Sequence, residues 1–391
     1  MAFRCGEQQL CRRDRRRKIG SLATALNYLS YGDTLNISAG TYTDNLTIDA
    51  SNVTIQGAGK GETIIAGAQN ESSTQGKVTV SANNVTFKGI TFEQAYEGFT
   101  EEKKAGDVPN TLFVIDAGYD VTIEDCEINR VSGDGYLARA YLVYVTPGDS
   151  VVTLRNTEMV APVSGPASDT EGDVQSVHSK SPAVIGDNGQ NSAFRLVMEG
   201  CTVMTNGYGI FLAADNATFT RTTFTGLDGV EWIDDEFKTA NDIRVTTLYM
   251  ALNDGAVENV TFDGCFIENT RSWGMLIAEG NITVNNCYIR SGSRAISASY
   301  GTVTNLTITN NIIDLSDNSY GIKFDEGSLD ASSEVTIDGN TFANLWDRAG
   351  TDYDDEYAVS NLTEIAVTVT NSIWDNCDET ADRTVGDVTL S

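Results

Sequence analysis

An eight-residue pattern of apolar and polar positions recurs along most of the chain. Each copy has an apolar residue, usually a threonine, a second apolar residue, two polar or small residues, a small or Cys/Asn residue, any residue, and mostly a final apolar residue. This alternation places the apolar pair on one face of a strand and the threonine on the other. The copies begin at Val53, Val85, Val121, Val152, Leu196, Ala217, Val260, Ile282, Leu306, Val335 and Val367.

The spacing of the copies predicts a coil of short strands. Neighbouring copies begin 21 to 44 residues apart, and the shortest intervals fit three short strands with three turns. Stacked coils would pair each strand in parallel with its copies above and below, and parallel crossovers are right-handed. The sequence therefore predicts an all-β fold, a single-stranded right-handed parallel β-helix of about 11–12 coils.

A second element recurs upstream of the main pattern and predicts another sheet of the same coil. It combines a small residue, which leaves room at a tight bend, with an apolar residue that faces inward. Its copies are Tyr208-Gly209-Ile210-Phe211, Trp273-Gly274-Met275-Leu276, Arg294-Ala295-Ile296, Tyr320-Gly321-Ile322-Lys323 and Tyr357-Ala358-Val359.

The N-terminal part of the chain differs from the repeats. Residues 19–31 have apolar side chains at helical spacing, so we expect a short amphipathic helix that caps the open end of the core. Residues 1–18 carry seven Arg or Lys against two acidic residues and show no periodicity. We expect a disordered basic leader there, with a nucleic-acid-binding or targeting arm as the alternative. The β-helix domain is then expected to span residues 19–391.

The first coil carries a resemblance to a known superfamily. Residues 32–65, GDTLNISAGTYTDNLTIDASNVTIQGAGKGETII, resemble the opening of pectin-lyase-like right-handed parallel β-helix proteins, particularly the pectin methylesterase and periplasmic copper-protein types. The coil pattern extends the resemblance over residues 19–376. The superfamily includes polysaccharide lyases, hydrolases, esterases, epimerases, tailspikes and noncatalytic surface proteins. The resemblance therefore implies the fold and leaves the activity open.

The known catalytic motifs of these families are incomplete here. GTYTD at residues 40–44 is similar to the first motif of pectin methylesterases, but the later Gln-rich and DFIFG motifs are absent. The Asn-Thr-Asp, Gly-His-Gly and Arg-Ile-Lys motifs of polygalacturonases and the Arg-x-Pro-x-x-Arg motif of pectate lyases are also missing. His178, in Ser-Val-His-Ser, has no neighbour in the sequence that would orient it as a base.

Charge and composition exclude several functions. The chain has 26 Lys and Arg against 55 Asp and Glu, a net charge of −29. We expect no nucleic-acid partner, because such proteins need a basic surface, and no membrane span, because there is no run of about 18 apolar residues. The single histidine excludes sites built on several histidines. An acidic polysaccharide would need Ca²⁺, or the few Lys and Arg side chains, to bridge the repulsion.

Four stretches interrupt the coils, and function concentrates on such loops. The acidic residues of the last stretch predict a calcium site, since Ca²⁺ takes about six to eight oxygen ligands. A base beside a calcium-bridged uronate would permit β-elimination, and we expect it to be Lys238 or Arg244. The alternative is a solvated acidic loop. The stretches are residues 93–111, 131–140, 160–182 and 225–245, and the expected metal ligands are Asp228, Asp234, Asp235 and Glu236.

The cysteines predict packing rather than a metal centre. Equivalent positions of stacked coils form a ladder, and a ladder does not converge tetrahedrally on a metal. The odd number of seven cysteines implies no disulfide framework. Four of them occupy the sixth position of the repeat: Cys126, Cys201, Cys265 and Cys287.

Two functions fit these observations. The first is a secreted or cell-surface protein that binds or processes a polysaccharide or cell-surface glycan in a groove along one sheet. If it is an enzyme, it is a polysaccharide lyase, with Ca²⁺ as a candidate cofactor, or a glycoside hydrolase. The second is a noncatalytic adhesin-like or structural stalk module. Secretion is implied by the family resemblance, and the oligomeric state is left open. Carboxylates that converge with Lys or Arg near aromatic rings would favour the first function.

Overall fold

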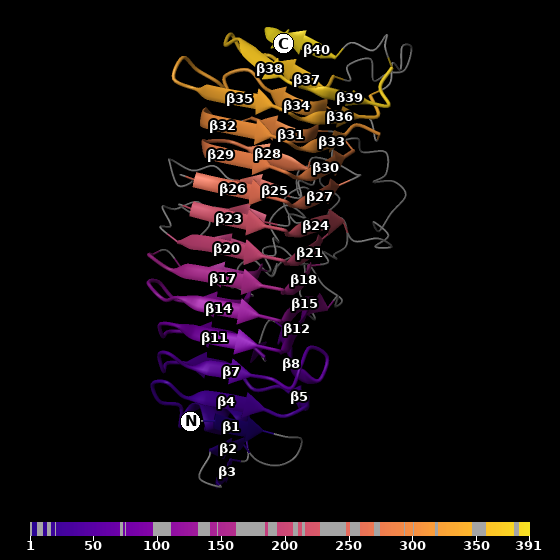
Figure 1. The fold of residues 1–391 in the computed structure, drawn as a ribbon. Helices are drawn as coiled ribbons and strands as arrows, with labels where there is room; N and C mark the ends of the chain where they lie inside the picture. Colours follow the sequence, from indigo (N-terminus) through magenta and orange to yellow (C-terminus); the bar gives the residue numbers. More distant parts are fainter. Residues whose placement is uncertain are drawn as a thin grey trace.

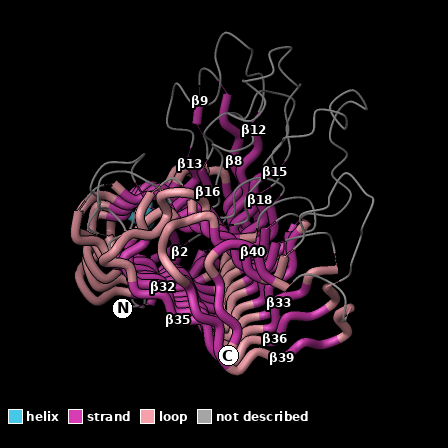
Figure 2. The backbone as a smooth tube through the Cα atoms, turned by 90° about the horizontal axis from the view of Figure 1, so that it is seen from above, coloured by secondary structure: helices cyan, strands magenta, loops and turns pink. Residues whose placement is uncertain are grey.

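The computed structural model is an elongated stack of short parallel strands (Figure 1). Successive coils lie over one another when the stack is seen along its axis (Figure 2). The structure describes residues 2–5, 11–13, 17–19, 21–70, 73–74, 76–96, 111–131, 141–146, 148–161, 184–186, 194–205, 210–212, 216–226, 248–250, 259–269, 274–292, 294–299, 301–316, 320–345, 357–378 and 383–391.

The first sheet, called sheet 1, contains the repeated apolar-Thr-apolar unit. Its strands pair in parallel and in register, so that Val85 lies beside Val121 and Thr86 beside Thr122. Its strands are β1 (Ala2–Cys5), β4 (Thr34–Ile37), β7 (Thr54–Gln56), β11 (Val85–Lys88), β14 (Val121–Glu124), β17 (Val151–Arg155), β20 (Arg195–Glu199), β23 (Asn216–Thr220), β26 (Asn259–Asp263), β29 (Gly280–Asn285), β32 (Val303–Thr309), β35 (Glu334–Asp338), β38 (Val367–Thr370) and β41 (Val388–Leu390).

Sheet 2 follows sheet 1 across a sharp corner. A residue with positive φ, such as Asn156 at 47° or Gly264 at 64°, makes this corner in most coils. Its strands are β5 (Gly40–Tyr42), β8 (Thr63–Asn70), β12 (Thr91–Tyr96), β15 (Glu127–Val131), β18 (Glu158–Ala161), β21 (Thr202–Thr205), β24 (Thr223–Gly226), β27 (Phe266–Asn269), β30 (Tyr288–Ser291), β33 (Ile312–Asp314), β36 (Thr341–Ala343) and β39 (Ile373–Asp375), with β9 (Ser73–Thr74) antiparallel to β8.

Sheet 3 closes each coil and contains the second repeated element. The chain passes through sheets 1, 2 and 3 in turn, so the predicted parallel β-helix is confirmed. The strands are β6 (Leu46–Ile48), β10 (Val78–Val80), β13 (Thr111–Ile115), β16 (Tyr141–Val145), β19 (Val184–Gly186), β22 (Ile210–Leu212), β25 (Leu248–Met250), β28 (Met275–Ile277), β31 (Arg294–Ala298), β34 (Tyr320–Phe324), β37 (Val359–Asn361) and β40 (Thr384–Gly386).

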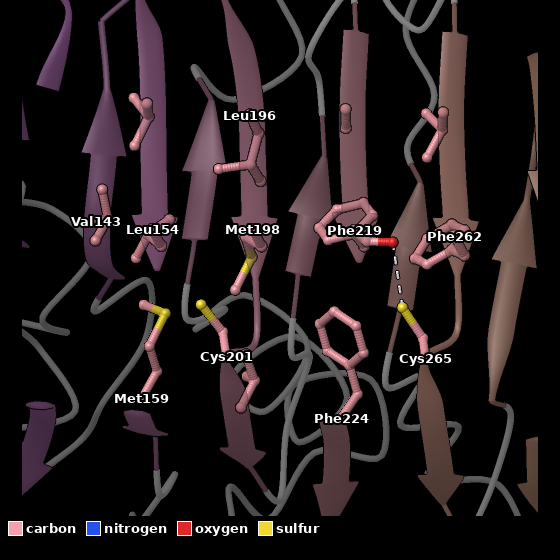
Figure 3. Close-up of a cluster of buried hydrophobic side chains, with 14 of the residues drawn as sticks. Val143, Leu154, Met159, Leu196, Met198, Cys201, Phe219, Phe224, Phe262 and Cys265 are labelled. Carbon is pink, nitrogen blue, oxygen red and sulfur yellow. Dashed lines mark hydrogen bonds between the residues drawn. The ribbon is translucent and has the colours of Figure 1, made fainter. Parts of the chain in front are cut away.

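The interior is one continuous apolar core of stacked side chains. Phe219 and Phe262 are fully buried on adjacent coils, with parallel rings whose centroids lie 4.6 Å apart (Figure 3). Cys201 and Cys265 point into the same core. The four cysteines of the repeat are at most 2% exposed, which agrees with the predicted inward ladder.

A short helix covers the N-terminal end of the core, as predicted. Helix α1 (Leu22–Leu26) buries Leu22, Ala25 and Leu26, and it packs against β4 and β6. Ser21 caps it by accepting a hydrogen bond from the Thr24 N–H. The helix is shorter than the predicted segment, because the chain turns at residues 27–33.

The segment before α1 contains three strands. Strand β1 pairs in parallel with β4, and β2 (Cys11–Arg13) pairs antiparallel with β3 (Arg17–Ile19). The domain boundary at residue 19 and the disorder of the leader stay predictions.

The four interruptions of the coil pattern share one place in the fold. Each lies where the chain passes from sheet 2 to sheet 3: β12 to β13, β15 to β16, β18 to β19, and β24 to β25. All four therefore lead into the N-terminal ends of strands of sheet 3. Most of their residues lie outside those that the structure describes.

Candidate functional site

The residues that the sequence singled out for calcium binding and catalysis lie in the segment between β24 and β25. Asp228, Asp234, Asp235, Glu236, Lys238 and Arg244 are all outside the described residues, so their roles stay predictions. Within the described ranges, no group of three or more His, Cys, Asp or Glu side chains could hold a metal ion.

A different set of polar side chains gathers on the outer face of sheet 3. In β31, Ile296 and Ala298 face the core, so the alternate residue Ser297 faces outward. The register places Ser297 between Leu276 of β28 and Lys323 of β34. The outward residue at this register position is therefore apolar in β28 and polar in β31 and β34.

One carboxylate gathers two cations at this place. Arg294 Nη1 lies 2.8 Å from Asp325 Oδ2, and Lys323 Nζ lies 3.6 Å from Asp325 Oδ1. The side chains of Arg294, Lys323 and Asp325 are 15%, 12% and 29% exposed. We call these three residues the Asp325 cluster. They carry two positive charges against one negative charge, so the cluster by itself has a charge of +1.

One buried serine is hydrogen-bonded to the carboxylate, and a second buried serine links it to Arg294. Ser299 donates a hydrogen bond to Asp325 Oδ2 and lies 3.1 Å, Oγ to Oγ, from Ser297. Arg294 Nη1 donates to Ser297 Oγ at 3.2 Å. Both serines are at most 1% exposed, so the network is held between β31 and the end of β34 and is not a mobile surface ion pair.

Aromatic rings border the cluster. The Lys323 ammonium lies 4.5 Å from the centroid of the Tyr320 ring, within the range of a cation–π contact. The ring centroids of Tyr320 and Tyr357, on neighbouring coils, lie 6.3 Å apart. Cations, a carboxylate and aromatic rings thus lie together at this part of sheet 3.

The electrostatic environment keeps Asp325 ionised. Burial by itself would raise the pKa of this carboxyl, but the hydrogen bond from Ser299 and the charges of Arg294 and Lys323 outweigh it. The pKa of Asp325 is therefore lowered from its ordinary value of 3.8. At neutral pH the carboxylate is charged and holds both cations in place.

This shift predicts a pH-dependent loss of stability in Asp325→Asn. Because the folded-state pKa is lowered, the carboxylate stabilises the fold above pH 3.8 and loses this contribution as the pH falls through the folded-state pKa. We expect the variant to unfold at lower urea concentration than the wild type at pH 7, with the difference shrinking below pH 3.8. Urea unfolding followed by circular dichroism checks this, and Asp49→Asn, at an exposed carboxylate, is the control.

Sequence reasoning missed this site although it noted the segments that form it. Arg294 and the segment from Tyr320 to Lys323 were interpreted only as copies of a structural repeat. The available signal was that Lys323 occupies the position of Phe211 and Leu276 in other copies, so a charge replaces an apolar residue. The contact of Arg294 with Asp325 depends on the stacking of adjacent coils, because the two residues are 31 positions apart in the sequence.

Comparison with known proteins bears on the fold. A family profile described as "Right handed beta helix region" matches residues 183–344. A solved PL6 alginate lyase in complex with a trisaccharide covers 100% of this chain and 86% of its own, with 13% identity and a TM-score of 0.51. The protein has a right-handed parallel β-helix fold.

Two further solved structures share less geometry with this β-helix. The A-module of the Azotobacter vinelandii mannuronan C-5 epimerase AlgE6 has 14% identity and a TM-score of 0.44, with coverage of 94% of this chain and 92% of its own. Pectin methylesterase PemA from Erwinia chrysanthemi has 12% identity and a TM-score of 0.34, with coverage of 96% and 91%. The search of curated protein sequences found no match.

The search for membrane-crossing helices was also negative. No helix in the described parts of this β-helix has the length and apolar character needed to cross a bilayer.

Proposed function

We propose that this β-helix binds and processes an acidic polysaccharide on the outer face of sheet 3, with the Asp325 cluster at the centre of the site. The observation that carries the proposal is the convergence of Arg294 and Lys323 on Asp325 beside the Tyr320 ring. The solved alginate lyase that shares the fold was captured with a trisaccharide, which supports a polysaccharide as the class of ligand.

The charge of the whole chain favours this location for an anionic substrate. With a net charge of −29, most of the surface repels a polyanion. Asp325 holds both cations of the cluster in place. A uronate carboxylate that approaches Arg294 or Lys323 therefore meets fixed positive charges, which cost little reorganisation on binding.

β-Elimination is the reaction that suits these groups. A cation against the uronate carboxylate stabilises negative charge on the neighbouring carbon. A base removes the proton from that carbon, the bond from C4 to the glycosidic oxygen breaks, and the departing oxygen takes up a proton. The products are an unsaturated uronate and a new sugar end. Tyr320 is the candidate base, the Lys323 ammonium is the candidate donor of a proton to the departing oxygen, and Arg294 is the candidate for carboxylate binding.

Calcium and the acidic segment belong to the same proposal. The acidic segment precedes β25, a strand of sheet 3. The other long insertions also precede strands of this sheet. The expected metal ligands of the acidic segment are Asp228, Asp234, Asp235 and Glu236. Bound Ca²⁺ would add positive charge that attracts a polyuronate, and Lys238 or Arg244 would then be alternatives to Tyr320 as the base. We further propose a secreted or cell-surface location, where such polysaccharides occur.

A polysaccharide panel tests this function. Purified protein is incubated with alginate, polygalacturonate and a neutral glucan, with Ca²⁺ or with EDTA, and absorbance near about 235 nm follows unsaturated products. We expect product from an acidic polymer and none from the glucan. Binding of an acidic polymer without product would contradict elimination, and neither binding nor product would favour the noncatalytic stalk.

A further inference from the structure

The buried cysteine ladder contains one pair of thiols on adjacent coils. The ladder position follows the corner between sheets 1 and 2, so its residues stack in the order of the coils. In the ladder, a threonine lies between Cys126 and Cys201, and another lies between Cys201 and Cys265. Cys265 and Cys287 occupy successive positions of the ladder. In coil order the ladder reads Cys126, Thr157, Cys201, Thr222, Cys265 and Cys287.

The register brings Cys265 and Cys287 to the separation that a disulfide needs. The strands on either side are paired in register, with Asp263 beside Asn285 and Phe266 beside Tyr288. Neighbouring strands lie about 4.8 Å apart, which falls within the Cα separation of about 4.4–6.8 Å found in disulfides. The Cys265 N–H donates a hydrogen bond to Cys287 Sγ at 3.4 Å.

The two thiols are buried and differ in acidity. Each residue is 2% exposed, and the Cys265 thiol donates to the Phe219 carbonyl oxygen at 3.3 Å (Figure 3). The hydrogen bond between the two thiols lowers the pKa of Cys265, and the same bond together with burial raises the pKa of Cys287. In the folded protein Cys265 is therefore the more acidic of the two thiols.

We infer that Cys265 and Cys287 are a disulfide-forming pair whose oxidant is a small-molecule or protein disulfide. One of the two thiolates attacks one oxidant sulfur, which forms a mixed disulfide and releases one thiol. The other cysteine then loses its proton and attacks the sulfur of the first, which forms the bond between the two Sγ atoms and releases the second thiol. The oxidant gains the two electrons and two protons that the pair loses.

The burial of the pair sets the time at which the bond forms. A disulfide oxidant reaches both thiols while the chain folds, before the coils close over them. The bond would join the coil of β26 and β27 to the coil of β29 and β30. Strand β31 follows directly and begins with Arg294 of the Asp325 cluster, so the bond would stiffen the coil that enters the site.

Refolding with and without oxidant tests the pair. The unfolded chain is refolded either with dithiothreitol or with a mixture of oxidised and reduced glutathione, and free thiols are then blocked with iodoacetamide under denaturing conditions. Trypsin cuts after Arg244, Arg271 and Arg290, so the two cysteines fall on different peptides, 245–271 and 272–290. Mass spectrometry then detects whether the peptides are linked.

We expect a linked pair of these peptides only after refolding with glutathione. Cys126 and Cys201 have the same burial and ladder position without an adjacent cysteine, so they serve as internal controls and should be alkylated in both samples. Alkylation of both Cys265 and Cys287 in the glutathione sample, or linkage of either to another cysteine, would overturn the inference.

The thermal midpoint gives a second readout. Oxidation should raise the unfolding midpoint of the wild-type protein by several degrees, because a cross-link between coils restricts the unfolded chain. Cys287→Ser should show no rise under the same treatment. A rise of equal size in Cys287→Ser would mean that another reaction stabilises the protein.

Discussion

Lys323→Met should lower the turnover of an acidic polysaccharide by about 100-fold or more, the usual contribution of a positioned proton-transfer group. Methionine keeps most of the length and the apolar stem of lysine but removes the charge and the transferable proton. The Lys323 ammonium contacts both Asp325 and the face of the Tyr320 ring. The rate of product formation at saturating polymer, measured beside wild type, checks this.

The matched control is a lysine in an ion pair on another face. Lys88 Nζ lies 3.1 Å from Glu124 Oε1 on sheet 1, and Lys88→Met makes the same chemical change away from sheet 3. We expect wild-type turnover from Lys88→Met, and an unfolding midpoint near wild type for both variants. Full turnover in Lys323→Met with a folded protein would remove the Asp325 cluster from the reaction and leave Lys238 and Arg244 as the candidate bases.

Phe262→Ala should destabilise the protein by about 3–5 kcal/mol, the range for large-to-small changes in a packed core. Phe262 is fully buried, stacks on Phe219 with centroids 4.6 Å apart, and meets Phe224 edge-on at 6.5 Å. The coils above and below cannot close the gap, because their strands are fixed in register on both sides. Urea unfolding monitored by circular dichroism measures the loss.

Phe266→Ala is the control for this substitution. Phe266 lies four residues further along and is 38% exposed on the outer face of sheet 2. It stacks on Tyr288, so its removal should cost much less than the removal of Phe262. Equal losses in the two variants would show that the aromatic ladder inside the coil has no special part in stability.

The fold was readable from the sequence because the repeat specifies it locally. In the repeat VTIEDCEI, the alternation of Val121, Thr122 and Ile123 turns the two apolar side chains toward the core. Asp125 has the positive φ that makes the corner. Each coil repeats this pattern of apolar and polar residues, and the apolar faces of similar units are buried when the coils stack. The helix at the N-terminal end was predictable for the same reason, since the first coil needs a cover.

The candidate site could not be read in this way. Arg294 and Asp325 are 31 residues apart, and their carboxylate–guanidinium contact exists only because β31 and β34 lie side by side. The sequence search favoured the acidic run around Asp234 because its charges are adjacent in the chain. Spatial neighbours in a β-helix are instead one coil apart, and the coils vary from 21 to 44 residues in length.

The sequence by itself determined the parallel β-helix, its capping helix and the inward cysteine ladder, because each follows from local alternation of apolar and polar residues. Only the tertiary structure decided that Arg294 and Lys323 share Asp325, and that the Cys265 backbone nitrogen lies 3.4 Å from Cys287 Sγ on the next coil. The physical reason is that unequal insertions shift the chain distance between stacked positions, so contacts across coils are set by register and not by sequence spacing.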